Sequence, residues 1–95
     1  MDTTRIQMEQ TVSQSPGNLV SDMDGEKVML SIQSGKYYNL GKVGGRIWEL
    51  IAAPVQVAAV VDSLVDEYEV ERSDCEAQVL AFLEHLQGEQ LIQIA

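Results

Sequence analysis

The chain has 95 residues, 45% of them hydrophobic, which is enough to build a single domain around its own core. Its 15 acidic residues outnumber six basic ones and give a formal net charge of −9, which argues against nucleic-acid binding because that affinity rests on Lys and Arg contacts to phosphate. One cysteine excludes an intramolecular disulfide, and without a signal-peptide pattern or an apolar run of about 20 residues we expect a cytoplasmic protein that does not enter a membrane.

The N-terminal segment looks different from the rest of the chain. Residues 1–17 are mostly polar, and they end in the Ser-Pro-Gly sequence at 15–17, which is typical of a turn or linker. The few apolar residues among them give only a weak strand pattern. We therefore predict an arm over residues 1–17 that is flexible or loosely paired, and a folded domain over residues 18–95.

Two turn signals divide residues 18–40 into three predicted strands. The Asp24-Gly25 dipeptide suits a tight hairpin because both positions tolerate a positive φ, and the Ser-Gly pair at 34–35 marks the next turn. Two sequential hairpins form an antiparallel sheet, in which the strand at 36–40 lies at one edge.

Alternation along these strands predicts which side chains face the core. The apolar residues of the second strand share one face, which we expect to be buried: Val28, Leu30 and Ile32. In the third strand, Tyr38 and Leu40 share one face. Tyr37 and Asn39 lie on the opposite face.

From Gly41 onwards, apolar residues repeat at helical spacing. The first predicted helix ends at the Ala-Pro pair 53–54, and the second carries an apolar stripe from Val57 to Tyr68. Near the start of the first helix, Gly44 and Gly45 lack the Lys-Ser/Thr ending and the βαβ context of a phosphate loop. We expect these two glycines to allow close packing.

The third predicted helix begins with a capping box, in which Ser73 is the N-cap and Glu76 bonds back to it. Gly88 is a natural end for this helix. Residues 91–94 are apolar and form either a short strand or a tail that covers the core. The fold class that follows is α+β, with a three-stranded antiparallel sheet followed by three helices.

The sequence does not favour catalysis. Cys75 and His85 lie on the same predicted helix, roughly 15 Å apart along its axis, so they cannot form a nucleophile–base pair. Cys75 falls on the apolar stripe, and His85 falls off it. The carboxylates are spread over helix surfaces, and no cluster of Cys and His suits a metal. We predict a protein that is not an enzyme and needs no cofactor.

Binding along the strand edge is the function that this pattern favours. An edge strand offers unpaired N–H and C=O groups to another chain, and neighbouring pockets then provide specificity. The third helix is a candidate wall for such a pocket. Asp74 and Glu76 in its first turn could attract Lys or Arg of a bound peptide.

The stretch GKYYNLGKVGGRIWELI at residues 35–51 resembles the PqqD-like family, and most closely the stand-alone leader-recognition proteins of lasso-peptide biosynthesis. The similarity continues through Pro54, the second predicted helix and residues 79–92. It covers about residues 17–94 and leaves the N-terminal arm outside.

The resemblance implies a winged-helix-like fold and a protein that binds the leader segment of a ribosomally made precursor peptide. The leader is expected to add as an antiparallel strand to the third strand, in a cleft between that strand and the third helix. The bound precursor would be presented to a leader-cleaving cysteine peptidase. The alternative is a chaperone of the PQQ pathway, whose partner is a radical SAM enzyme.

Transferred to this chain, the resemblance and the charge pattern predict two groups of binding residues. The leader-pairing strand consists of Lys36, Tyr37, Tyr38, Asn39 and Leu40. The facing helix contributes Asp74, Cys75, Gln78, Val79, Phe82 and Leu86, with Phe82 as an aromatic anchor. Tyr38, Val79, Leu83 and Leu86 are equally consistent with core positions, and Trp48 is predicted to be structural.

Other functions stay open at this point. Winged helices commonly bind DNA, but the predicted third helix has no Lys or Arg after Ser73. A generic scaffold protein that contacts its partner through the acidic second helix is compatible with leader binding. We expect a monomer, or a weak dimer formed by pairing of the same strand edge.

Overall fold

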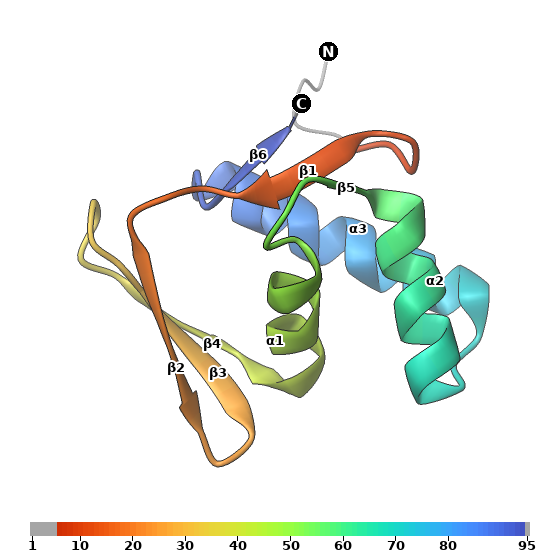
Figure 1. The fold of residues 1–95 in the computed structure, drawn as a ribbon, viewed down its shortest axis with the longest axis horizontal. Helices are drawn as coiled ribbons and strands as arrows, with labels where there is room; N and C mark the ends of the chain where they lie inside the picture. Colours follow the sequence, from red (N-terminus) through yellow and green to blue (C-terminus); the bar gives the residue numbers. More distant parts are fainter. Residues whose placement is uncertain (1–5, 95) are drawn as a thin grey trace.

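The computed structural model describes residues 6–94, which form two three-stranded antiparallel sheets and three helices (Figure 1). The elements follow the order β1 (Thr11–Gln14), β2 (Asn18–Met23), β3 (Glu26–Ser31), β4 (Tyr37–Leu40), α1 (Gly41–Leu50), β5 (Val55–Gln56), α2 (Val57–Tyr68), α3 (Arg72–Gly88) and β6 (Ile92–Ile94). The predicted α+β class is confirmed, and the order of three strands before three helices is present as β2–β4 and α1–α3.

The first sheet has the strand order β2-β3-β4, as the two turn signals predict. Asp24 and Gly25 connect β2 to β3 with φ values of 56° and 83°, and Gly35 in the next turn has a φ of 73°. These left-handed conformations are the ones that tight hairpins need. β4 therefore lies at an edge of its sheet, which confirms the prediction.

The buried face of β3 is not the predicted one. Met29 and Ser31 are buried, whereas Val28 and Leu30 are half-buried on the other face. Ile32 lies beyond the strand and is exposed. Because both faces of β3 carry apolar residues, hydrophobic alternation alone does not decide between them.

The second sheet, with the order β5-β1-β6, is absent from the sequence-based prediction. Val12 of β1 pairs with Val55 on one side and with Ile94 on the other, and its side chain is completely buried. The backbone N–H of Ile6 donates a hydrogen bond to Glu84 of α3 at 3.2 Å.

The segment at 6–14 is thus packed into the fold, and β1 corresponds to the weak strand pattern within the predicted arm. β5 is only two residues long and gives no recognisable strand pattern, whereas β6 confirms the short-strand alternative for residues 91–94. Residues 1–5 of the predicted arm lie outside the described part of the chain.

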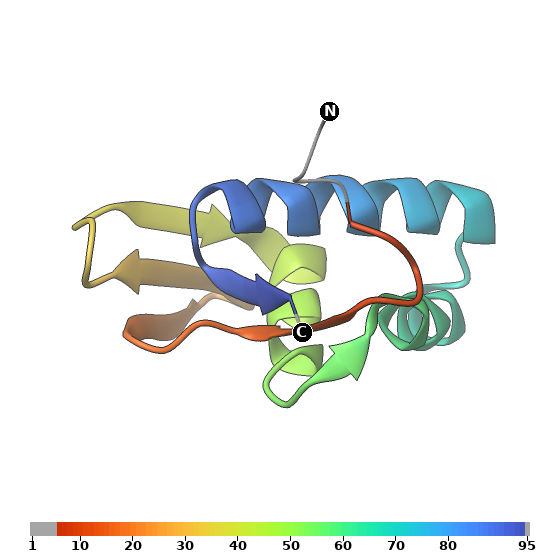
Figure 2. The same cartoon turned by 90° about the horizontal axis from the view of Figure 1, so that it is seen from above.

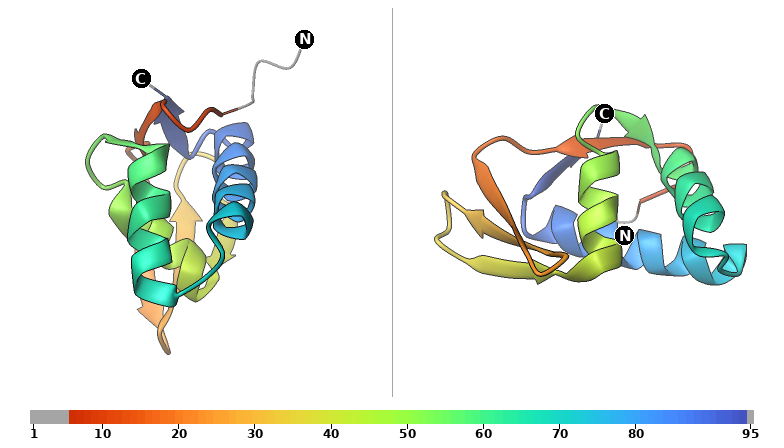
Figure 3. Two further views of the ribbon diagram at one scale, coloured as in Figure 1. Left: turned by 90° about the vertical axis from the view of Figure 1, so that its right-hand side faces the viewer. Right: turned by 60° about the horizontal axis from the view of Figure 1, so that its bottom comes forward.

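The three helices and β1 enclose one hydrophobic core. Ile47 and Trp48 of α1 are buried in it, as is the stripe of α2 from Val57 to Leu64. α2 packs against α3 at the end of the molecule opposite the β3–β4 turn (Figure 2). α3 runs along one side of this core, next to β4 (Figure 3).

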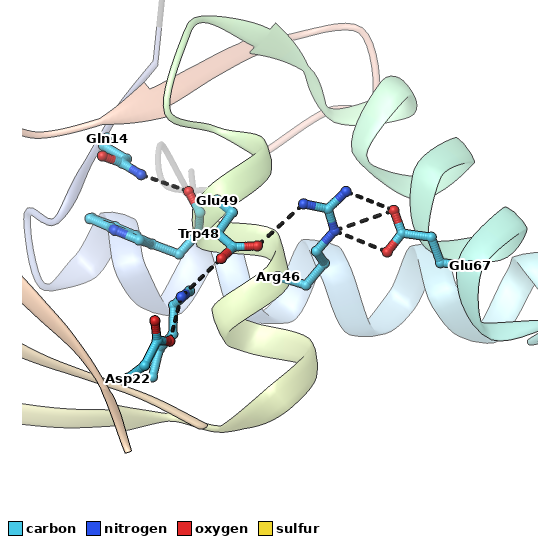
Figure 4. A network of polar contacts seen from close by, with 7 residues as sticks. Gln14, Asp22, Arg46, Trp48, Glu49 and Glu67 are labelled. Carbon is cyan, nitrogen blue, oxygen red and sulfur yellow. Dashed lines mark hydrogen bonds and ion pairs between the residues drawn. The ribbon is translucent and has the colours of Figure 1, made fainter. Parts of the chain in front are cut away.

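Polar contacts connect α1 to β1 and to α2 (Figure 4). The side-chain amide of Gln14 in β1 donates to the Trp48 carbonyl at 2.7 Å. Arg46 binds Glu67 of α2 at 2.8 Å and Glu49 at 3.2 Å. These contacts fix the orientation of α1 relative to β1 and α2.

The predicted capping box at the start of α3 is wrong. The N-cap is Glu71, two residues before the predicted Ser73, so the helix begins at Arg72, and no side chain caps its N-terminus. Glu76 instead accepts a hydrogen bond from Arg72 Nε at 3.1 Å, because the two residues lie one turn apart on the helix surface. The helix ends at Gly88 as predicted, although the left-handed residue that follows is Gln90, with a φ of 62°.

Candidate functional site

The outer edge of β4 carries main-chain groups that no strand within residues 6–94 pairs with. The Ser31 N–H donates to the Lys36 carbonyl at 2.9 Å, and Leu30 lies opposite Tyr37. In an antiparallel ladder, residues alternate between bonding inward and facing outward. The N–H and C=O groups of Tyr37 and Asn39 therefore point away from β3, towards the open edge.

An apolar cavity of about 560 Å³ lies where β4 ends and α1 begins. It is bounded by α1, by the end of α2 and by the first half of α3. Its lining residues are Leu40, Val43, Gly44, Ile47, Leu64, Tyr68, Val70, Glu71, Asp74, Cys75, Gln78, Val79 and Phe82. Val43, Tyr68 and Val70 are exposed apolar side chains, so the apolar surface extends to the mouth of the cavity.

The structure brings many of the predicted binding residues together in this cavity: Leu40, Asp74, Cys75, Gln78, Val79 and Phe82. The predicted strand residues Lys36, Tyr37, Tyr38 and Asn39 do not line it and lie along β4 beside it. Leu86 belongs to neither group, because it does not line the cavity and is buried in the core.

Cys75 lines the cavity but its environment is poor for nucleophilic chemistry. Burial raises the pKa of the thiol, which favours its neutral form over the reactive thiolate. His85 lies at an exposed position in the last turn of α3. Over residues 6–94, no three His, Cys, Asp or Glu side chains are grouped so as to hold a metal ion.

A polar contact links β4 to the end of α3, at the opposite end of β4 from the cavity. The Tyr38 hydroxyl donates to Glu89 Oε1 at 2.7 Å, and Lys36 Nζ lies 3.7 Å from the same oxygen. The Tyr38 hydroxyl and then the charge of Lys36 lower the pKa of Glu89. The strip between β4 and α3 is thus apolar at one end and polar at the other.

Sequence reasoning did not identify the contribution of α1 and α2 to this site. Val43 and Tyr68 belong to apolar stripes with helical spacing. A helical stripe shows that one face is buried, but it does not distinguish a core contact from the wall of a cavity. Glu89 was missed because its contact with Tyr38 joins residues 51 positions apart.

Comparison with known protein families identifies the chain. A family profile described as "Coenzyme PQQ synthesis protein D (PqqD)" matches residues 26–92, which is more than half of the chain. The protein belongs to the PqqD family. The match includes β3, β4 and all three helices, and it therefore contains both the open strand edge and the cavity. Curated protein sequences contain no significant match.

Three solved structures resemble this PqqD-family protein. TbiB1 in complex with the TbiA(beta) leader peptide is 32% identical, with 85% of this chain and 94% of that chain covered and a TM-score of 0.77. A lasso peptide synthetase B1 complexed with the leader peptide is 28% identical, with 86% and 96% covered and a TM-score of 0.75.

The third structure is the PqqD truncation of Methylobacterium extorquens PqqCD, described as a functional and stand-alone RiPP recognition element. It is 16% identical, with 98% of this chain and 99% of that chain covered and a TM-score of 0.81. At this identity the similarity establishes the fold. Among the helices of residues 6–94, none is long and apolar enough to cross a membrane.

Proposed function

We propose that this PqqD-family protein binds the leader segment of a ribosomally synthesised precursor peptide and delivers it to a leader-cleaving peptidase. In this proposal, the leader adds as an antiparallel strand to β4. The observation that carries it is the open edge of β4 next to an apolar cavity. The two B1 proteins that share the fold at 32% and 28% identity, each in complex with a leader peptide, support this assignment.

The edge and the cavity would serve different purposes in recognition. The outward N–H and C=O groups of Tyr37 and Asn39 would bond to the peptide main chain and provide affinity independent of sequence. The cavity would take an apolar side chain of the leader and so provide specificity. Glu71 and Asp74 at its wall favour a leader that carries Lys or Arg close to this apolar side chain.

Antiparallel addition to β4 also defines the direction of the peptide. The N-terminal part of the leader would lie beside Leu40 and the cavity, because β4 runs towards that end. The C-terminal part, which leads to the segment that is processed, would leave past Lys36. The processing enzyme would therefore act near the β3–β4 turn.

The outer face of the first sheet supports contact with such an enzyme. Leu19, Leu30 and Tyr37 lie in one row across β2, β3 and β4. Leu19 and Tyr37 are 58% and 74% exposed, and Ile32 beside the β3–β4 turn is also exposed. An exposed apolar area of this kind is typical of a protein interface.

The alternative partner is a radical SAM enzyme of the PQQ pathway. The higher identity to the lasso B1 proteins, compared with 16% to the Methylobacterium extorquens protein, favours the peptidase. In either pathway we propose that the domain is an adaptor that does no bond chemistry itself.

Titration with a leader peptide tests the binding proposal. Isotope-labelled protein would be titrated with the TbiA(beta) leader peptide and with leaders from other lasso precursors, and a scrambled peptide of equal charge would be the control. We expect saturable amide shifts at residues 37–40 and 74–82 with at least one leader and none with the scrambled peptide. Shifts that do not saturate with any leader would refute leader binding.

A further inference from the structure

Gly44 lies so close to the ring of Phe82 that a side chain at this position would not fit. It is buried in α1 and lines the cavity together with Phe82 of α3. A Cβ atom at Gly44 would lie 3.0 Å from both Cε1 and Cζ of the Phe82 ring. Contacts this short are tighter than ordinary van der Waals packing, so any residue other than glycine would push against the ring.

The two helices themselves are held more firmly than this ring. α1 is anchored by buried Ile47 and Trp48, and its Arg46 is tied to α2. α3 is anchored on the other side by a row of buried residues: Cys75, Val79, Leu83 and Leu86. Phe82 is only half-buried and borders open space in the cavity. A side chain added at Gly44 would therefore displace the Phe82 ring rather than either helix, and the ring would move into the cavity.

We infer that Gly44 is a positioning residue, which sets the width of the cavity by letting the Phe82 ring lie directly against α1. This inference deepens the proposed function and rests on it, because the cavity is then the pocket for a leader side chain. Gly44 makes no bond to the leader in this view. It determines how large a side chain Phe82 leaves room for.

Gly45 offers a matched control on the same helix. It is also buried, and a Cβ atom there would lie 2.9 Å from Cγ of Lys27. It does not line the apolar cavity. Gly44→Ala and Gly45→Ala therefore introduce the same methyl group, the same gain in helix propensity and similar crowding, but only the first affects Phe82.

The binding test compares these variants in the full chain, with the fluorescent TbiA(beta) leader peptide as probe. We expect Gly44→Ala to raise the Kd on the order of ten-fold, because overpacking at the pocket displaces the ring, and Gly45→Ala to leave it within about two-fold. Adding Phe82→Leu to Gly44→Ala shortens the displaced side chain and should restore most of the affinity. Equal Kd values for the two alanine variants would overturn the inference.

A second measurement does not depend on a leader. Cys75 is the chain's only cysteine and lines the same cavity, so the rate at which a small methanethiosulfonate reagent modifies it reports access to the cavity. A narrower cavity should make Gly44→Ala react several-fold more slowly than Gly45→Ala. General destabilisation would instead speed up the reaction by exposing the thiol.

These two measurements separate the inference from the proposed function. If the wild-type protein binds no leader but Gly44→Ala still slows modification of Cys75, leader binding fails and the role of Gly44 stands. If the wild-type protein binds a leader and both alanine variants react at the same rate, the role of Gly44 fails and leader binding stands.

Discussion

Replacing Tyr37 by proline removes a single hydrogen-bond donor from the edge that we propose for the leader. The N–H of Tyr37 faces away from β3, so proline at this position removes no hydrogen bond between β3 and β4. Proline is tolerated at such positions of edge strands. The Tyr37 side chain is 74% exposed, and its loss should cost the fold little. Tyr37→Ala is the matched control, because it removes the same side chain and keeps the N–H.

The size of the effect follows from the number of bonds that are lost. One intramolecular hydrogen bond contributes about 1 kcal/mol net, which corresponds to a roughly five-fold rise in the Kd of the leader. The peptide carbonyl left without its donor lies at the rim of the sheet, where water can reach it, so the larger penalty of a buried unpaired group should not apply. We expect Tyr37→Pro to bind about five-fold more weakly than Tyr37→Ala.

Isothermal titration calorimetry with a leader that binds the wild-type protein would measure this difference, and circular dichroism would confirm that both variants keep their fold. Equal affinities for Tyr37→Pro and Tyr37→Ala would refute strand addition at this edge. Leader binding would then have to use side-chain contacts alone.

Three further changes test other parts of the structure. Val12→Ala deletes two buried methyl groups worth about 0.8 kcal/mol each and should lower the Tm by about 6–13 °C. Val20 is 37% exposed, so the control Val20→Ala should lower the Tm much less. Equal Tm shifts for the two variants would mean that β1 does not contribute to the core. The Tyr38 hydroxyl lowers the pKa of Glu89 from 4.5, so the stability that this carboxylate adds is present above about pH 4.5 and is lost as the pH falls through the lower folded pKa. Glu89→Gln should therefore reduce the Tm at about pH 7 but not at about pH 2. A reduction of the Tm that is independent of pH would contradict this. Asp74→Asn should raise the Kd of a basic leader by up to about five-fold at low salt and make this Kd less dependent on salt concentration. An unchanged salt dependence of the Kd would exclude a charge contact between Asp74 and the leader.

Local patterns in the sequence were sufficient for the elements that depend on neighbouring residues. Asp24 and Gly25 predict the β2–β3 hairpin because only some residues adopt positive φ easily. Two consecutive hairpins then place β4 at an edge, and the apolar stripe of α2 predicts its buried face. The family could also be recognised at this level, since the residues that carry the resemblance lie within 35–51.

The tertiary structure decided the features that join distant parts of the chain. Val12 belongs to a sheet because β5 and β6 pair with it, and no local pattern shows that these distant segments meet, although residues 91–94 by themselves allowed a short strand. β3 has apolar residues on both faces, so only packing against the rest of the molecule selects Met29 for the core. The cavity depends on the contact between Gly44 and Phe82, which lie 38 positions apart. Sequence alone determined which strand edge is open, whereas the fold decided which pocket lies beside it, because a pocket is formed by side chains that only tertiary packing brings together.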